Sequence, residues 1–251
     1  MALAVLRLVF DRSLLTFDAA RHRHLYDGKQ LIGVTTALGM ISKGDAITQW
    51  AVNQSLEFLT NAFAQEGEYA PEEIQAFLLQ AKYAWRAKRD EAADIGTQAH
   101  NWIESYLKGE NPDLIWPKHP AVRKSCEAAV KWTEAHHWQT IEIEKQVYHP
   151  KLGYAGILDW WVFIDGVPSI PDWKTSKAIY STHRYQTAAY LKAVELETRE
   201  YIRNRWVLRI DKSTGEFEDV KLQRGTLADD WRCFKAALAL YKREKQLKEE
   251  K

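Results

Sequence analysis

The amino-acid sequence predicts a single α/β domain with an N-terminal β-ribbon and a helical insertion. Short apolar runs separated by turn residues occupy the first 40 residues, and Asp27-Gly28 between two of them is typical of a β-hairpin. Apolar residues recur at helical spacing between residues 45 and 108. Strand-like segments punctuated by Pro and Gly then follow from Ile141. These changes of period along the chain indicate an α/β fold.

Each part of the chain has its own expected elements. They are, in order, a strand over 2–10, three helices between 45 and 108, a helix over 121–137, strands over 141–148, 154–164 and 167–173, a helix over 182–197, strands over 201–210 and 217–222, and a helix from 227. No repeat or linker divides the chain. We therefore expect one domain over 1–251, with the ribbon over 1–44, a helical part over 45–137, and a sheet core with the C-terminal helix over 138–251.

Composition excludes several classes of protein. With 46% hydrophobic residues and a net charge of +1, the chain is not a disordered polyelectrolyte, and any nucleic acid would have to bind to local positive charge. Cys126 and Cys233 are too few for a disulfide framework, and they fit a reducing compartment. No run reaches the ~18 to 20 apolar residues of a membrane helix. We expect no membrane association and a cytoplasmic location, in a bacterial or phage-infected cell.

Two aspartates are predicted to face each other across a hairpin. If Asp165-Gly166 forms a two-residue type I′ turn, Ile164 pairs with Val167. The same register places Asp159 opposite Asp172, with their Cβ atoms about 4.5 to 5.5 Å apart. Apolar residues flank Asp159 on both faces of its strand, which indicates a central position in the sheet. Two carboxylates buried in this way repel each other unless a cation or a proton lies between them.

A divalent cation would remove this conflict. Because carboxylate oxygens without a nearby thiol favour a hard ion, we expect Mg²⁺ or Mn²⁺. Such an ion would support hydrolysis of a phosphodiester, in which Lys174, two residues beyond Asp172 on the same face, orients the attacking water or neutralises charge. The alternative is that Pro168 and Pro171 mark a bulged edge strand, which would destroy the register and leave Asp172 and Lys174 as an ordinary ion pair.

These residues resemble the motifs of a nuclease superfamily. Gly156 and Asp159, followed by Asp172-Trp173-Lys174-Thr175-Ser176, resemble the PD-(D/E)xK nucleases. Three further segments resemble motifs of their RecB-like branch and of its phage-type and mitochondrial-genome-maintenance-type exonucleases: Gln186-Thr-Ala-Ala-Tyr190, Gly96-Thr97-Gln98-Ala99-His100, and Gly33-Val34-Thr35-Thr36 with Trp50. The resemblance covers about residues 25 to 210 in motif order.

The resemblance implies a restriction-endonuclease-like core, which is a mixed central β-sheet flanked by helices. It also implies cleavage of DNA with Mg²⁺ or Mn²⁺, often by an exonuclease of recombination, repair or replication that requires a free DNA end. Several relatives bind an iron–sulfur cluster through four cysteines, whereas this chain has two, so we expect no iron–sulfur cluster. No particular recombinase or helicase partner is indicated.

The resemblance assigns roles to the residues of the predicted hairpin. Asp159 and Asp172 are expected to be metal ligands, and the backbone carbonyl of Trp173 a further ligand. Lys174 is expected to activate the water. The side chain of Trp173 fits the core better than the site.

Four residues on two predicted helices complete the candidate site. His100 is a further ligand that favours Mn²⁺, or else a histidine on the helix surface. Glu104 lies one turn further on, as a ligand or as part of a solvated face. Gln186 and Tyr190 share one helix face, where they would orient the lysine or contact a nucleotide, unless Tyr190 belongs to an amphipathic core.

The sequence leaves open the roles of two glutamates and of two basic clusters. Glu142 and Glu144 alternate with isoleucines on the neighbouring strand, and only one face of that strand can look into the site. The basic clusters over 82–89 and 199–209 could follow a phosphate backbone, although a solvated helix face explains the first cluster equally well. The alternative functions are a non-catalytic nucleic-acid-binding module and a phosphodiesterase acting on small nucleotides.

Overall fold

The computed structural model describes residues 11–41, 45–64, 68–110, 113 and 115–250, so the predicted strand over 2–10 lies outside the described residues. An antiparallel ribbon of β1 (Leu15–Asp18), β2 (Arg23–Tyr26) and β3 (Lys29–Gln30) comes first. Asp27 and Gly28 link β2 to β3 with positive φ angles of 48° and 70°, as a type I′ turn requires. The predicted N-terminal ribbon is confirmed.

The main sheet has six strands of mixed direction among the described residues. They are β4 (Ile32–Gly33), β5 (Trp138–His149), β6 (Tyr154–Ile164), β7 (Val167–Lys174), β8 (Asn204–Ile210) and β9 (Phe217–Gln223). The order is β4-β6-β7-β8-β9, and β5 pairs with β6. The β4–β6 and β7–β8 pairs are parallel, and the other pairs are antiparallel. This is the mixed sheet that the resemblance implies.

The described helices agree with the predicted ones to within a few residues, except that the first and shortest of them was not predicted. They are α1 (Val34–Leu38), α2 (Asp45–Ala62), α3 (Pro71–Ala81), α4 (Ala84–Leu107), α5 (Pro120–Glu134), α6 (Ser181–Thr198) and α7 (Leu227–Glu249), with short 3₁₀ turns at Arg12–Leu14 and Arg224–Thr226. The helix predicted over 121–137 ends at Glu134, because β5 begins at Trp138. Of the helices described, none is both long and apolar enough to cross a membrane.

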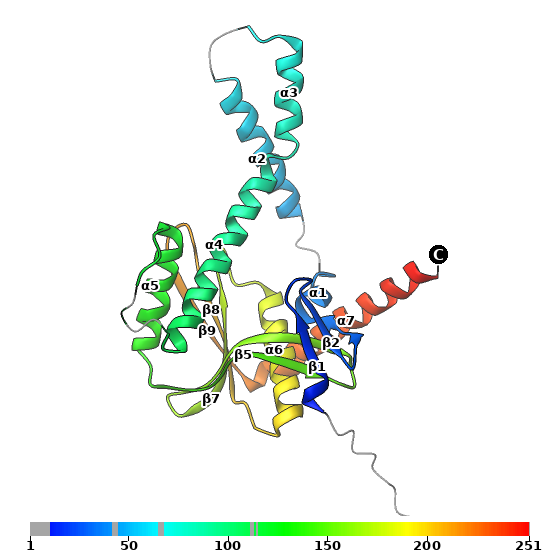
Figure 1. Ribbon diagram of the computed structural model, residues 1–251, viewed down its shortest axis with the longest axis vertical. Coiled ribbons are helices and arrows are strands. Elements are labelled where there is room, and N and C mark those ends of the chain that lie inside the picture. Colours follow the sequence, from blue (N-terminus) through cyan, green and yellow to red (C-terminus); the bar gives the residue numbers. More distant parts are fainter. Residues whose placement is uncertain (1–10, 42–44, 65–67, 111–112, 114, 251) are drawn as a thin grey trace, which may run out of the picture.

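Helices cover the sheet through two apolar cores (Figure 1). The first core joins α1, α6 and α7 to the strands through residues such as Tyr154, Leu191 and Phe234. The second joins α4 and α5 to the sheet through residues such as Ile103 and Trp160. Trp160 and Trp173 are almost fully buried, so these tryptophans are core residues rather than surface platforms for bases.

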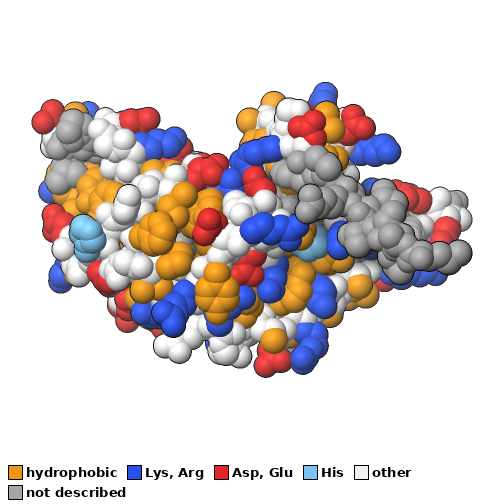
Figure 2. Space-filling view, turned by 90° about the horizontal axis from the view of Figure 1, so that it is seen from below, with side chains coloured by type: hydrophobic (Ala, Val, Ile, Leu, Met, Phe, Trp, Pro, Cys, Tyr) orange, Lys and Arg blue, Asp and Glu red, His pale blue; other side chains and the backbone are white. Residues whose placement is uncertain are grey.

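The helices α2 and α3 project from this body as an arm (Figure 1). Near the turn between them, Phe63, Tyr69 and Phe77 pack edge to face, with ring centroids 5.4 to 5.7 Å apart. Helix α4 begins in the arm and ends against the sheet. On the face of the molecule shown in Figure 2, basic and acidic side chains are interspersed, as the net charge of +1 leads us to expect.

The two cysteines are expected to differ in reactivity. Cys126 is buried on α5, and burial raises the pKa of its thiol to about 12, whereas Cys233 is exposed on α7. A disulfide reagent that reports free thiols should label one thiol per native chain, and both after denaturation. The variant Cys233→Ser should lose the fast reaction. Equally fast labelling of both thiols in the native protein would contradict the packing of α5.

Candidate active site

Strand β6 has one edge that is only partly paired. On its other edge β5 pairs with β6 from Tyr154 to Ile164. On the partly paired edge, β4 pairs with Tyr154 and Ala155 at the start of β6, and β7 pairs with the last three residues of β6, from Val162. Among the described residues, therefore, no strand pairs with the part of β6 between Ala155 and Val162 on this edge. Asp159 lies in the middle of this gap.

The predicted hairpin forms only at its closed end. Asp165 and Gly166 have positive φ angles of 51° and 75°, and Ile164 pairs with Val167 as expected. The ladder between β6 and β7 ends at Ser169, from where β7 pairs with β8 instead. Pro171 follows shortly after this point and has no amide hydrogen to donate to β6. Asp159 and Asp172 are therefore not a cross-strand pair, in contrast to the prediction.

A backbone hydrogen bond nevertheless connects Asp159 to the segment that carries Asp172. The amide N–H of Trp173 donates to Asp159 Oδ2 over 2.8 Å. Burial raises the pKa of Asp159. Burial also raises the pKa of Asp172 to about 6; the ammonium group of Lys174 opposes this rise, and the charge of Asp159 adds to it. The two carboxylates thus form the repelling pair that the sequence predicts, although in a different geometry.

Lys174 supplies the positive charge next to this pair. Its Nζ lies 2.6 Å from Asp172 Oδ2. Burial lowers the pKa of Lys174, but Asp172 and Asp159 raise it by more, so that the pKa lies above its ordinary value. The lysine is therefore protonated at neutral pH. It carries an ammonium group rather than a free amine.

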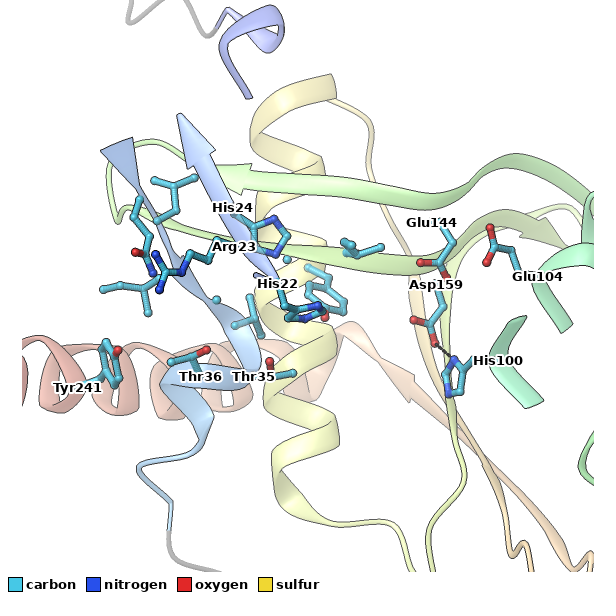
Figure 3. Close-up of a pocket in the computed structure, with 18 of the residues that line it drawn as sticks. His22, Arg23, His24, Thr35, Thr36, His100, Glu104, Glu144, Asp159 and Tyr241 are labelled. Carbon is cyan, nitrogen blue, oxygen red and sulfur yellow. Dashed lines mark ion pairs between the residues drawn. The ribbon is translucent and has the colours of Figure 1, made fainter. Parts of the chain in front are cut away.

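Helix α4 brings His100 and Glu104 to the same place (Figure 3). His100 Nδ1 lies 3.8 Å from Asp159 Oδ2. Burial lowers the pKa of His100 to about 4, and the charge of Lys174 adds to this effect, so the imidazole is neutral at pH 7. Glu104 forms an ion pair with Lys108, one turn further along the helix. His100 and Glu104 therefore both face the cleft, and the carboxylate of Glu104 is also paired with the ammonium group of Lys108.

A close contact explains the glycine that precedes His100. A Cβ atom at Gly96 would lie 2.8 Å from Thr175 Oγ1, which is too close for any larger residue without a shift. Thr175 directly follows β7. Gly96 does not begin a helix, since α4 runs from Ala84 to Leu107. It allows α4 to approach the end of the strand that carries Asp172 and Lys174.

Gln186 and Tyr190 form a buried layer behind the carboxylates. The amide of Gln186 donates to Tyr190 Oη over 2.9 Å and to Asp172 Oδ1 over 3.4 Å. Burial raises the pKa of Tyr190 well above its usual value, so the phenol is neutral. The sequence prediction that these two residues share one helix face near the lysine strand agrees with this arrangement. Gln186 thus contacts the Asp172 carboxylate directly.

Glu144 also lines the cleft, and the sequence could not separate it from Glu142. The pairing of β5 with β6 shifts register between Thr140 and Glu142, and Glu144 has a positive φ of 51°. These irregularities send the two glutamates in different directions. Glu142 accepts a hydrogen bond from Lys145 over 2.8 Å, whereas burial and the charge of Asp159 raise the pKa of Glu144 to about 8. Of these two glutamates, Glu144 is the one that lines the cleft, which the alternation of residues along the strand could not decide.

The cleft extends well beyond the acids. It has a volume of about 280 Å³, and the acidic end is formed by His100, Glu104, Glu144 and Asp159. The other end is lined by His22, Arg23 and His24 of the ribbon, by Gly33–Thr36, and by Tyr241 and Lys245 of α7. The motif at 33–36 and Asp159 thus line one cleft, although more than 100 residues separate them. Trp50 is not among the lining residues.

The donor groups fit a hard divalent cation in kind. Two carboxylates with raised pKa values and a neutral imidazole are the oxygen and nitrogen ligands that Mg²⁺ or Mn²⁺ accepts. Their spacing is wider than a closed metal site, because within the described residues no three His, Cys, Asp or Glu side chains form a group that could hold a metal ion. A bound cation would therefore have to draw these side chains together.

Comparisons with known proteins do not assign a family. No family model and no curated protein sequence matches the chain. Among solved structures, the chain is similar to a protein from Eubacterium rectale named "Putative exonuclease", with 13% identity and a TM-score of 0.41 over 59% of this chain and 66% of that one. It is also similar to SSO0001, with 14% identity and a TM-score of 0.26 over 75% of this chain and 85% of that one. The chain thus spans just under two thirds of the first protein.

We predict that Gly156→Ala destabilises the fold by disturbing Tyr190. A Cβ atom at position 156 would lie 2.6 Å from Tyr190 Cε1, so the ring would have to move. Overpacking of this kind costs about 1 to 3 kcal/mol in the free energy of unfolding, which urea denaturation measures. Gly225→Ala is the matched control, because nothing lies within 4 Å of a Cβ atom there. Equal stability of the two variants would show that Tyr190 does not pack on β6.

Proposed function

We propose that the protein is a metal-dependent deoxyribonuclease that hydrolyses DNA phosphodiester bonds and acts from a free DNA end. The observation that carries this proposal is that Asp159, which lines the acidic end of the cleft, is bound by the Trp173 amide of the same segment in which protonated Lys174 pairs with the buried Asp172. Two repelling carboxylates next to an ammonium group are costly to bury, which favours a catalytic role over a structural one. The motif resemblance points to the same chemistry.

The residues of the site have distinct roles in this proposal. Asp159 and Asp172 would hold the cation, with His100 as a neutral further donor. Such a cation, when bound, would polarise the phosphoryl oxygen and lower the pKa of a water molecule. The ammonium group of Lys174 places positive charge where the phosphate becomes more negative during the reaction. Gln186 fixes the carboxylate of Asp172 through its 3.4 Å hydrogen bond. Glu104, Glu144 and the carbonyl of Trp173 are the remaining candidate ligands.

One observation favours a non-catalytic nucleic-acid-binding module instead. Among the described residues no group of three metal-binding side chains is assembled. A binding module would retain the basic and polar end of the cleft without needing the acids. The acids themselves argue against this alternative, because carboxylates close to the bound strand repel phosphate. The two functions differ in whether bonds are broken.

Removal of the charge of Lys174 or Asp172 should strongly slow cleavage. We expect Lys174→Ala and Asp172→Asn to lower the rate of DNA hydrolysis by about 10²-fold or more, as the loss of one charge-stabilising group does in other enzymes. The measurement is digestion of end-labelled linear DNA with Mg²⁺, with Mn²⁺ or with a chelator, resolved by fragment length. Asp229→Asn, at an exposed ion pair on α7, is the control. Undiminished cleavage by Lys174→Ala, or in the chelator, would contradict the mechanism.

The requirement for a free end can be tested on the same protein. Linear DNA should be degraded faster than the same sequence closed into a circle, because a circle offers no end to enter the cleft. A dinucleotide substrate separates this activity from a phosphodiesterase acting on small nucleotides. Equal rates on linear and circular DNA would show that cleavage starts internally.

A further inference from the structure

Helix α4 carries a continuous stripe from the arm to the cleft. Arg86, Arg89, Ala93 and Thr97 precede His100 at intervals of three or four residues, and Glu104 follows at the same spacing. Since α4 is one unbroken helix from Ala84 to Leu107, this spacing places all six on one face. The first four side chains are exposed. We call Arg86, Arg89, Ala93 and Thr97 the α4 stripe.

The far end of the α4 stripe combines basic and aromatic side chains. The guanidinium group of Arg86 lies 4.4 Å from the ring centroid of Tyr83 and 5.7 Å from that of Trp85. The guanidinium group of Arg89 lies 5.1 Å from the ring of Trp85 and also binds Asp90. Within the described part of the chain, no carboxylate lies within ion-pair distance of Arg86. The stacked guanidinium group of Arg86 thus keeps its N–H donors available, and such groups bind phosphate in two-pronged contacts.

The middle of the stripe is narrow and uncharged. Ala93 and Thr97 have short side chains, and the Thr97 hydroxyl donates back to Ala93 O over 3.1 Å. Of the neighbouring acids, Asp90 is paired with Arg89, and the Asp94 carboxylate accepts a hydrogen bond from Gln98, one turn further on. A polyanion lying along Ala93 and Thr97 would meet no bulky side chain there, and the carboxylate of Asp90 beside Arg89 is already neutralised by that arginine.

The length of the stripe fits a few nucleotides. Arg89 and Arg86 lie 11 and 14 residues before His100, which is about 16 and 21 Å at 1.5 Å per residue. A strand of duplex DNA advances about 3.4 Å per nucleotide, so these distances correspond to about five to six nucleotides. A strand with one phosphate at the acidic end of the cleft would reach both arginines.

We propose that the α4 stripe binds the phosphodiester backbone of the DNA strand whose reacting phosphate lies in the cleft. This inference rests on the proposed nuclease function, and it states where the DNA strand lies on the protein outside the cleft. Arg86 and Arg89 contact phosphates about five to six nucleotides from the reacting bond. Tyr83 and Trp85 hold the two guanidinium groups in place.

The first test is the salt dependence of DNA binding, measured in a chelator so that binding is observed without cleavage. Arg86→Ala should weaken binding of a fluorescent 15-nucleotide strand several-fold. It should also lower the slope of log Kd against log salt by about 0.7, the value expected for loss of one phosphate contact on a single strand. Arg86→Lys should restore most of the slope, because it restores the charge. Lys88→Ala is the matched control, since Lys88 lies on another face of the same helical turn and pairs with Glu57.

A second pair of variants tests the path between the arginines and the cleft. Ala93→Glu puts a carboxylate on the stripe and should weaken binding of the 15-nucleotide strand, whereas Gln98→Glu adds the same charge on the opposite face and should have little effect. Both positions are exposed, so neither change disturbs the core. Thermal unfolding of each variant verifies that α4 stays folded.

The outcomes separate this inference from the function on which it rests. Wild-type cleavage of DNA combined with equal salt slopes for Arg86→Ala and Lys88→Ala would overturn the path and leave the nuclease proposal intact. Equal loss of binding in Ala93→Glu and Gln98→Glu would overturn it in the same way. A wild-type protein that neither binds nor cleaves DNA would overturn both.

Discussion

The separation of β6 from β7 beyond Ser169 is the constraint on which the candidate site depends. Up to that residue the two strands form an ordinary hairpin, and beyond it β7 pairs in parallel with β8. Within the described part of the chain, the separation leaves the middle of β6 without a paired strand on one edge, and Asp159 lies in this space. The amide of Trp173 bridges the gap to Asp159 at 2.8 Å and keeps the DxK segment close to it. A continuous ladder would have filled this space with backbone hydrogen bonds.

The electrostatic pattern follows from burying these charges together. Burial and mutual repulsion raise the pKa values of Asp172 and Glu144, while burial lowers the pKa of His100. The ammonium group of Lys174 offsets part of the negative charge. The layer behind the site is equally well held: Arg205, almost fully buried on β8, donates to the carbonyl oxygen of Arg184 on α6 and binds Asp230 on α7. This anchor fixes α6, and with it the Gln186 amide that holds Asp172.

Local signals in the sequence predicted most of the fold, and long-range pairing accounts for what they missed. Asp165-Gly166 predicts its turn because both central residues of a type I′ turn must adopt positive φ, so two adjacent residues carry the whole signal. The departure of β7 depends on β8, which lies some 30 residues later in the chain, so no hairpin rule contains it. The direction of Glu144 depends on a register shift after Thr140, which alternation of apolar and polar residues does not reveal. The sequence predicted that the motif residues share a site. It did not predict that Asp159 would bind the Trp173 amide or that Gln186 would bind Asp172.

The packing of α4 fixes the position of the arm relative to the site. Gly96 lets the helix touch Thr175 at the end of β7, and Ile103 and Leu107 bury its last turns against the sheet. The helix is thereby fixed to the strand that carries Asp172 and Lys174. Its first turns lie in the arm, 11 or more residues before His100. Because a continuous helix bends only gently without a proline or a bulge, the arm cannot swing freely relative to the acids. Groups at the start of α4 are therefore held at a set distance from the cleft, and in the proposed nuclease this fixed spacing would let one rigid element contact both a distant phosphate and the reacting one.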